Sequence, residues 1–234
     1  MLDWLLETLF PTRGELHGFE EAGPVWVAPE SADGFGLVGI GGDLHPDRLL
    51  AAYRQGVFPM YEESEPICWW SPDPRAIFEL DAVHFSRRLM RTVRSGRFQI
   101  TFNQDFQAVM RGCADRPEGT WITPDMLEAY YRLHRLGNAH SVEVWRCGQL
   151  VGGVYGVAVG GLFAGESMFH TERDASKVGL VHLFDRLQSC GFDLFDTQIL
   201  NDHTAQLGAH EIPRTEYLER LREAIKKPVV FSNE

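Results

Sequence analysis

The chain has 234 residues, of which 44% are hydrophobic and 24% charged, so it can bury a sizeable core as one large domain or one domain with a smaller addition. Its 22 basic and 33 acidic residues give a net charge of −11, which opposes non-specific binding to nucleic acid. The first residues, MLDWLLETLF, carry no basic segment, and no apolar run approaches the roughly 18 residues of a membrane span. We therefore expect neither secretion nor membrane insertion.

The cysteines and histidines show no metal-binding or disulfide pattern. Cys68, Cys113, Cys147 and Cys190 form no CxxC pair, and the nine histidines never occur as HExxH. The expectation is a cytoplasmic protein with reduced thiols, no metal and no cofactor.

The first part of the chain predicts a small domain. Residues 1–35 are rich in Pro, Gly and Glu and predict a loop-rich cover with one short helix. A helix is expected to begin at Pro46, which suits a first turn, and to end at Gly56 and Pro59. The two prolines of CWWSPDPRA then indicate a break.

We place a domain boundary at this break, near residue 73. The predicted domains are residues 1–73 and residues 74–234. The second begins with the strand AIFEL, the helical stretch SRRLMRTVR, the strand FQITFN and the helices QDFQAVMRGCA and TPDMLEAYYRLHRLG. Thr123 or Asp125 is the expected cap of the last of these helices.

The remaining sequence predicts an antiparallel meander, a helix and a final strand. The segment SVEVWRCGQLVGGVYGVAVGGLFAGESMF alternates strand signals with turns at Cys147-Gly148 and Gly160-Gly161. DASKVGLVHLFDRLQSCGF has a helical apolar stripe that ends at Gly191, and the strand DLFDTQI follows. The sum is an α+β fold with a central, mostly antiparallel sheet flanked by helices.

This order of elements resembles the GNAT acyltransferase architecture. GNAT enzymes that use acetyl-CoA carry a glycine-rich loop before the helix, where backbone N–H groups bind the pyrophosphate. The matching connection here, SMFHTERDASKVG, has no such loop. CoA is therefore a poor candidate donor.

One stretch contradicts the acidic average. SRRLMRTVRSGRF contains five arginines and no acid, and in a helix Arg87, Arg91 and Arg94 share one face. This stripe is either a solvated helix face or a surface for a phosphate backbone, bound with salt-sensitive affinity.

Eight motifs carry a more specific resemblance. GGDLHPDRLLAAYRQGVFP, WWSPDPRA, GTWIT, AHSVEVW, LVGGVYGV, GESMF, ASKVGL and DTQILNDHTAQLGAHEIPR resemble, in order, the motifs of the leucyl/phenylalanyl-tRNA-protein transferase family, over roughly residues 34–220. The resemblance implies a small N-terminal α+β domain, a GNAT-like catalytic domain and transfer of Leu or Phe, and Met less well, from aminoacyl-tRNA. The acceptors would be proteins beginning with Arg or Lys, which are thereby tagged for N-degron proteolysis.

The end of the last strand is the expected catalytic site. An aminoacyl ester is already activated, and an α-amine has a pKa near ~8, so the enzyme needs positioning and a proton acceptor more than a nucleophile. Asp196 and Gln198, at i and i+2 of a strand, are expected to face the same side and meet the amine. The resemblance implies that they relay its proton, and that Glu166 and Asn201 orient the substrates. His203 is the rival base, although a structural role in a turn suits it better.

A donor that carries Leu or Phe needs a dry, adaptable pocket. The resemblance implies that it is lined by Val154, Phe163, Met168, Leu180 and Phe195. Each of these side chains, taken alone, equally fits an ordinary core.

The resemblance also implies where tRNA binds. Trp121 matches a family tryptophan at the terminal adenosine, and Met60 stands where some members have a stacking tryptophan. Arg87, Arg91 and Arg94 match the basic cluster for the acceptor stem. The partners implied are Leu-tRNA and Phe-tRNA, acceptor proteins with N-terminal Arg or Lys, and no membrane. We expect a monomer.

Two other hypotheses remain open at this point. A CoA-dependent N-acyltransferase would share the architecture but should bind CoA. A non-catalytic binder of tRNA ends or protein N-termini would keep the arginine stripe and the pocket, but would not need Asp196 or Gln198.

Overall fold

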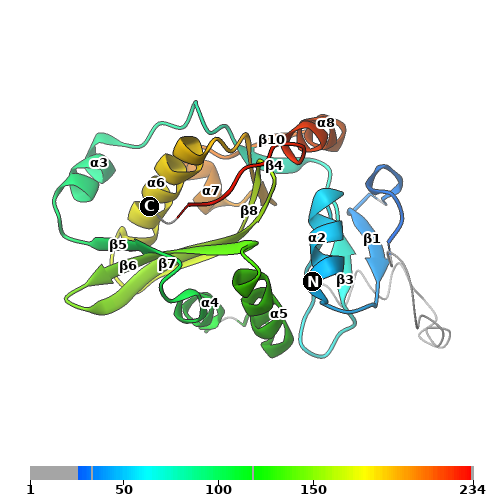
Figure 1. Ribbon diagram of the computed structural model, residues 1–234, viewed down its shortest axis with the longest axis horizontal. Helices are drawn as coiled ribbons and strands as arrows, with labels where there is room; N and C mark the ends of the chain where they lie inside the picture. Colours follow the sequence, from blue (N-terminus) through cyan, green and yellow to red (C-terminus); the bar gives the residue numbers. More distant parts are fainter. Residues whose placement is uncertain (1–25, 33, 118, 233–234) are drawn as a thin grey trace.

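The computed structural model describes residues 26–32, 34–117 and 119–232. These residues form an α+β fold with a small sheet and a large sheet (Figure 1). Most of the predicted N-terminal cover lies outside the described residues, which include from it only the 3-10 turn η1 (Pro29–Ser31) and its surroundings.

The small sheet has the antiparallel order β1-β3-β2, formed by β1 (Leu37–Ile40), β3 (Cys68–Trp70) and β2 (Phe58–Pro59). Helix α2 (Pro46–Arg54) begins at Pro46, as predicted. Its buried face includes Tyr53, which is 1% exposed. This helix therefore turns a large polar-tipped side chain toward the rest of the molecule.

The large sheet has the order β10-β4-β9-β8-β7-β6-β5. Its strands are β4 (Arg75–Phe78), β5 (Gln99–Phe102), β6 (Ala139–Arg146), β7 (Gln149–Val159), β8 (Leu162–His170), β9 (Leu194–Gln198) and β10 (His210–Ile212). Neighbouring strands are antiparallel except β8 and β9, which are parallel. The predicted fold class, a mixed and mostly antiparallel sheet with flanking helices, is confirmed.

Helices cover both faces of this sheet (Figure 1). Helices α4 (Phe106–Ala114) and α5 (Pro124–Arg135) lie on one face, and α3 (Arg87–Arg94), α6 (Ala175–Cys190) and α7 (Asp202–Gln206) on the other. Helix α8 (Arg214–Ala224) packs against Ile77 of β4 and Leu194 of β9. Thr123, not Asp125, caps α5, and Gly191 ends α6 in the left-handed region at φ 84°, where a glycine is unstrained.

One hydrophobic cluster connects the two sheets. It contains Trp69 of the small sheet and Tyr53 of α2, and it continues through Tyr130 of α5 to Tyr155 of β7, all buried. Residues on both sides of the proposed boundary near residue 73 thus share a core, and the division into two domains stays a prediction.

The pairing of β8 with β9 is short, so the two strands separate and leave a gap in the sheet between them. The strands pair from Leu162 and Leu194 to Ala164 and Asp196, after which β8 continues beside β7 alone. At that point Tyr155 of β7 faces Ser167 and the next residue faces Gly165, so Glu166 is the extra residue of a β-bulge. A bulge re-aims its side chain, here into the space between the diverging strands.

Candidate active site

A cavity of about 750 Å³ lies where β8 and β9 separate. Its walls come from these two strands, from β4 and β7, from the first turn of α6, from α7 and from the segment that follows α4. The cleft therefore draws on parts of the chain that are far apart in sequence.

One part of the cleft is apolar. Val154, Met168, Leu180 and Phe195 line it, as the resemblance implied for the aminoacyl pocket. Phe163, the fifth residue of that prediction, is not among the lining residues: it is 1% exposed and meets the Phe195 ring edge-on, with centroids 5.5 Å apart. Phe163 is the register partner of Phe195 and lies on the same face of the sheet, where it packs in the core beside the residues that line the cleft.

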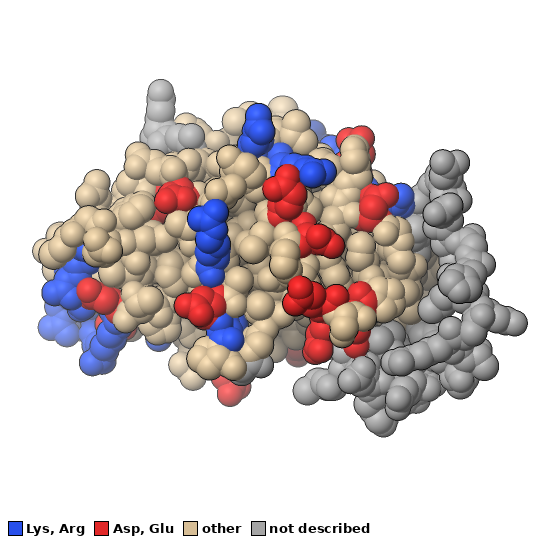
Figure 2. Space-filling model, turned by 90° about the horizontal axis from the view of Figure 1, so that it is seen from below, with Lys and Arg blue, Asp and Glu red and all other residues tan. Residues whose placement is uncertain are grey.

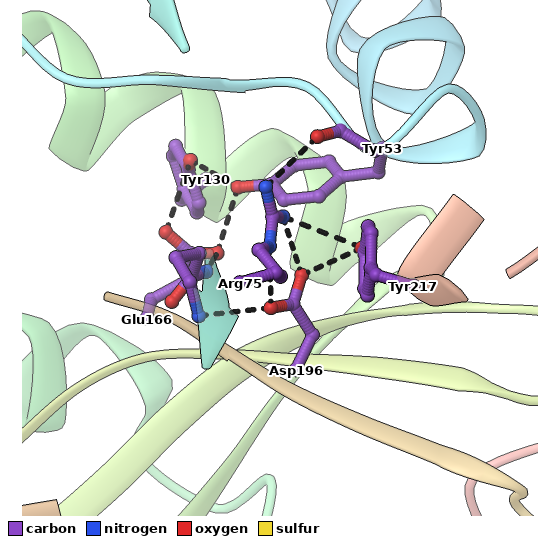
Figure 3. A network of polar contacts seen from close by, with 8 residues as sticks. Tyr53, Arg75, Tyr130, Glu166, Asp196 and Tyr217 are labelled. Carbon is purple, nitrogen blue, oxygen red and sulfur yellow. Dashed lines mark hydrogen bonds and ion pairs between the residues drawn. The ribbon is translucent and has the colours of Figure 1, made fainter. Parts of the chain in front are cut away.

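Glu166 forms the polar part of the cleft (Figure 3). Its Oε1 accepts hydrogen bonds from the Tyr53 hydroxyl at 2.8 Å and from the Gln198 Nε2 at 3.1 Å, and its Oε2 accepts one from the Tyr130 hydroxyl at 3.4 Å. The two hydroxyl oxygens are 2.5 Å apart. Three elements, α2, α5 and β9, thus hold one carboxyl group in place.

The environment of Glu166 also sets its protonation. Burial raises the pKa of this carboxyl to about 8; the hydrogen bond from Tyr53 opposes that rise and the negative charge of Asp196 adds to it. At neutral pH the free carboxyl is therefore mostly protonated. A cation bound beside it would favour the charged form.

Asp196 is fully buried and does not line the cleft. Its Oδ1 and Oδ2 accept hydrogen bonds from Nε and Nη2 of Arg75 at 2.9 and 2.6 Å, and Oδ2 accepts another from the Tyr217 hydroxyl at 2.8 Å (Figure 3). This carboxylate is buried because a buried guanidinium needs a paired carboxylate. The expectation that Asp196 and Gln198 both meet the substrate amine stays a prediction.

Gln198 reaches the cleft because the strand ends there. Its backbone has φ 60°, the left-handed region, and its side chain lines the cleft beside Glu166. The Oδ1 of Asp196 accepts a hydrogen bond from the Gln198 backbone N–H at 2.8 Å. Asp196 therefore stabilises the left-handed backbone conformation of Gln198, and this conformation directs the Gln198 amide toward Glu166.

Asn201 and His203 also line the cleft. Asn201 caps α7, where its Oδ1 accepts from the Thr204 N–H at 2.9 Å, so its carbonyl oxygen is engaged and its amide NH₂ is left for a ligand. Burial lowers the pKa of His203, and the charges of Lys177 and His170 lower it further. The imidazole is accordingly neutral at neutral pH.

Of the two residues expected at the terminal adenosine, only Trp121 lines the cleft. Met60 does not, and its role at the adenosine stays a prediction. It packs against the cluster that joins the two sheets, and its carbonyl oxygen accepts from the Trp70 Nε1 at 2.8 Å. Next to Trp121 in the wall, Arg116 donates to the Ser167 hydroxyl at 3.0 Å.

Helix α3 carries the arginine stripe outside the cleft. Arg87, Arg91 and Arg94 are exposed, and none of them makes an ion pair within residues 26–32, 34–117 and 119–232. Figure 2 shows basic side chains gathered at the end of the molecule that carries β5 and β6, and acidic ones toward the small sheet. The net negative charge is thus unevenly distributed.

Sequence reasoning missed four contributors to this network, namely Arg75, Tyr53, Tyr130 and Tyr217. Arg75 was noted only as part of a motif, although an arginine at the start of the buried strand RAIF signals a buried carboxylate partner. Tyr53 and Tyr130 fit helical apolar stripes, and nothing in the sequence distinguishes them from core tyrosines.

Two further kinds of site are absent from the described residues, a metal-binding cluster and a membrane-spanning helix. Within them, no three His, Cys, Asp or Glu side chains gather in a way that could hold a metal ion. None of the helices of the described chain is long and apolar enough to cross a membrane.

The α+β fold thus contains a two-part cleft, apolar at one side and with a carboxyl and an amide group at the other, an arrangement compatible with an enzyme of the acyl-transfer type. Two family models match the chain: the leucyl/phenylalanyl-tRNA protein transferase model over residues 77–222, and the N-terminal domain model of the same transferase over residues 42–73. The chain therefore belongs to the leucyl/phenylalanyl-tRNA protein transferase family. It is an aminoacyltransferase that acts between aminoacyl-tRNA and protein.

Individual relatives agree with this. The leucyl/phenylalanyl-tRNA–protein transferase of Solidesulfovibrio magneticus is 52% identical over 205 residues, 86% of this chain and 83% of the relative. That of Anaeromyxobacter dehalogenans is 48% identical over 211 residues, 88% of this chain and 91% of the relative. Among solved structures, a GCN5-related N-acetyltransferase-like protein from Streptococcus suis has a TM-score of 0.34 at 12% identity, with 71% and 63% of the two chains covered, a similarity too low to carry an argument.

Proposed function

We propose that this protein transfers Leu or Phe, and Met less well, from aminoacyl-tRNA to the α-amine of proteins that begin with Arg or Lys, and thereby tags them for N-degron proteolysis. The observation that carries the proposal is that an apolar surface and a carboxyl group held by three donors share one cleft. The apolar surface suits the donor side chain, and the carboxyl suits a cationic acceptor side chain.

In this proposal the donor side chain packs against Val154, Met168, Leu180 and Phe195. The branched Cβ of Ile or Val then fits this surface less well. Packing differences of this kind favour Leu and Phe by a few kcal/mol. Trp121 stacks on the terminal adenosine, which is worth ~1–3 kcal/mol.

The acceptor is held at Glu166. Its carboxyl gives up a proton when the guanidinium or ammonium group arrives, because a nearby cation favours the charged form. Two carboxylate oxygens also match the two parallel donors of an arginine side chain. Asn201 assists from the start of α7.

The chemistry then needs no nucleophile from the protein. The α-amine nitrogen attacks the ester carbonyl carbon, the C–N bond forms, and the C–O bond to the terminal ribose breaks. The amine loses a proton and the departing ribose oxygen gains one. Gln198 orients the amine by its amide, and Asp196 acts as a positioning residue through the Gln198 backbone.

The tRNA body is bound outside the cleft. Arg87, Arg91 and Arg94 contact phosphates of the acceptor stem, and their lack of intramolecular ion pairs in the described chain leaves them available. We further propose that residues 1–73 and 74–234 are two domains and that the protein acts as a monomer.

The test is transfer of radiolabelled Phe from Phe-tRNA to two peptides that differ only in beginning with Arg or with Ala. Label should appear on the Arg peptide and be largely lost with Glu166→Gln and Gln198→Ala. Equal labelling of both peptides would overturn the acceptor assignment. A folded protein that binds tRNA and transfers nothing would leave only the binding hypothesis.

A further inference from the structure

A second, smaller cavity of about 230 Å³ lies beside the active-site cleft, between α3, α6 and α7. Its walls include Arg88 of α3, Asp174 and Lys177 at the start of α6, and Gln206 of α7. It belongs neither to the aminoacyl cleft nor to the exposed arginine stripe.

The first turn of α6 separates the two cavities. Ser176 faces the cleft, whereas the preceding Asp174 and the following Lys177 face the second cavity. Lys177 is close enough to His203, a cleft residue, for its charge to lower the pKa of that imidazole. The ammonium group is therefore positioned between the cleft and the cavity.

The charge around the second cavity is positive. Its walls carry two cations, Arg88 and Lys177, and one anion, Asp174. Asp174 is already shared by Arg88, at 3.4 Å, and by Arg173, at 3.7 Å. Lys177 has no ion pair within the described chain, and it is only half-buried, so a ligand can reach it.

The position of this cavity relates it to the substrate. Helix α3 packs through Leu89 against Val178 and Val181 of α6, and the same helix carries Arg88 in the cavity wall and the exposed Arg87 and Arg91. An aminoacyl-tRNA must continue from its terminal adenosine to its acceptor stem through a short single strand with a phosphate at each step. With the adenosine in the cleft and the stem on α3, as proposed above, a cavity lined by both α3 and α6 is a suitable place for one of these phosphates.

We propose that the cavity formed by Arg88 and Lys177 binds a backbone phosphate of the single-stranded 3′ end of aminoacyl-tRNA, with Lys177 as the main contact. The inference rests on the proposed binding of the donor in the cleft and of the stem on α3. The phosphate replaces water around Lys177 and draws Arg88 away from Asp174, which keeps Arg173 as a partner. This contact would fix how far the ester carbonyl enters the cleft.

The test uses three hydrolysis-resistant donors with a 3′-amide in place of the ester: full-length Phe-tRNA, the trinucleotide CCA-Phe, and Phe-adenosine, which has no phosphate. Their affinities are measured by titration for wild type and for Lys177→Met, Lys177→Arg and Arg91→Met. Lys226→Met is the matched control, since that lysine lies beyond the end of α8 and pairs with Glu223.

We expect Lys177→Met to lower the affinity for full-length Phe-tRNA and for CCA-Phe about fivefold, the effect of one charge pair in water. The affinity for Phe-adenosine should not change. The dependence of log affinity on log salt should lose about 0.7 in slope for CCA-Phe. Lys177→Arg should restore both. Arg91→Met should lower the affinity for full-length Phe-tRNA only. If it does not, the assignment of the acceptor stem to α3 is wrong, whatever the result for Lys177.

Either of two results would overturn the proposal. Equal weakening of Phe-adenosine by Lys177→Met would mean that Lys177 acts within the cleft, through His203 or the α6 turn. Unchanged affinity for CCA-Phe would mean that no phosphate binds there. If wild type binds no donor at all, it is the donor assignment of the cleft that fails.

Discussion

Arg75 and Asp196 form a bidentate ion pair with both side chains 1% exposed. The pair joins β4 to β9 directly beneath the active-site cleft, and the Gly56 carbonyl oxygen accepts a further hydrogen bond from Arg75 at 3.0 Å. A carboxylate so fully occupied is suited to holding structure in place. The first two predictions follow from this assignment.

Asp196→Asn should destabilise the fold strongly. It leaves the Arg75 cation buried without a countercharge, which costs about 3–5 kcal/mol of unfolding free energy in comparable cases. Urea denaturation measures this loss, and the double variant Arg75→Met with Asp196→Asn should lose less than the sum of the single variants. In the fraction that stays folded, the pH profile of kcat/KM should move toward lower pH, because the negative charge of Asp196 raises the Glu166 pKa. Loss of an entire limb of the profile would show instead that Asp196 exchanges the substrate proton.

Gln198→Ala should lower kcat with little effect on stability. The variant keeps the backbone N–H that Asp196 binds but loses the amide that contacts Glu166. Loss of positioning at a reacting centre costs about 100-fold. Single-turnover transfer with both substrates saturating checks this. A change confined to KM would contradict an orienting role for the amide.

Acceptor binding should strengthen as the pH rises toward 8. The free Glu166 carboxyl has a pKa of about 8, and a bound cation lowers it, so binding releases a proton below that pH and the affinity levels off above it. A peptide beginning with N-acetyl-Arg isolates this effect, because it has no titrating α-amine. Calorimetry from pH 6 to 9 should show the rise in wild type. Glu166→Gln should show weak and flat binding, and a rise that persists in that variant would exclude Glu166 as its source.

Tyr53→Phe should move this pH dependence upward. The Tyr53 hydroxyl stabilises the charged carboxylate, so its removal raises the Glu166 pKa further and weakens acceptor binding at pH 7. Tyr155→Phe is the matched control, because the Tyr155 hydroxyl is buried with no hydrogen-bond partner among the described residues, and its removal should be neutral or stabilising. Identical pH profiles for wild type and Tyr53→Phe would contradict this assignment.

Val154→Phe should change the donor preference. Val154 is 3% exposed and lines the apolar part of the cleft, so a larger side chain takes volume that Phe needs more than Leu does. We expect kcat/KM for Phe-tRNA to fall at least tenfold relative to Leu-tRNA, within the range that pocket volume controls. Phe163→Leu, in the core beside the cleft, should lower stability and leave the ratio unchanged. An unchanged ratio in Val154→Phe would place the donor side chain elsewhere.

Much of the fold could be predicted from local patterns. The helix that begins at Pro46, the turn at Gly160 and the helix end at Gly191 are each fixed by residues within a few positions. The parallel contact between β8 and β9 was not part of that prediction, since it depends on how α6 crosses the sheet.

The site could be predicted less completely, for a physical reason. Periodicity places Asp196 and Gln198 on one face, but φ 60° at Gln198 ends the regular strand, and a local pattern does not encode that. Likewise, Arg75 needs a buried anionic partner only because the folded core buries it, and the local sequence does not show which carboxylate that partner is. The motifs could identify the residues of the site. They could not show which of these residues line the cleft.

The hydroxyl of Tyr53 makes the acidity of the active site depend on a helix from the N-terminal part of the chain. Any slippage of α2 against α5 would break this bond and also the contact between the two tyrosine hydroxyls. The same small displacement would then leave Glu166 protonated and poorly able to attract a cation. Packing of α2 against the rest of the molecule thus contributes to the pKa of the carboxyl group in the cleft.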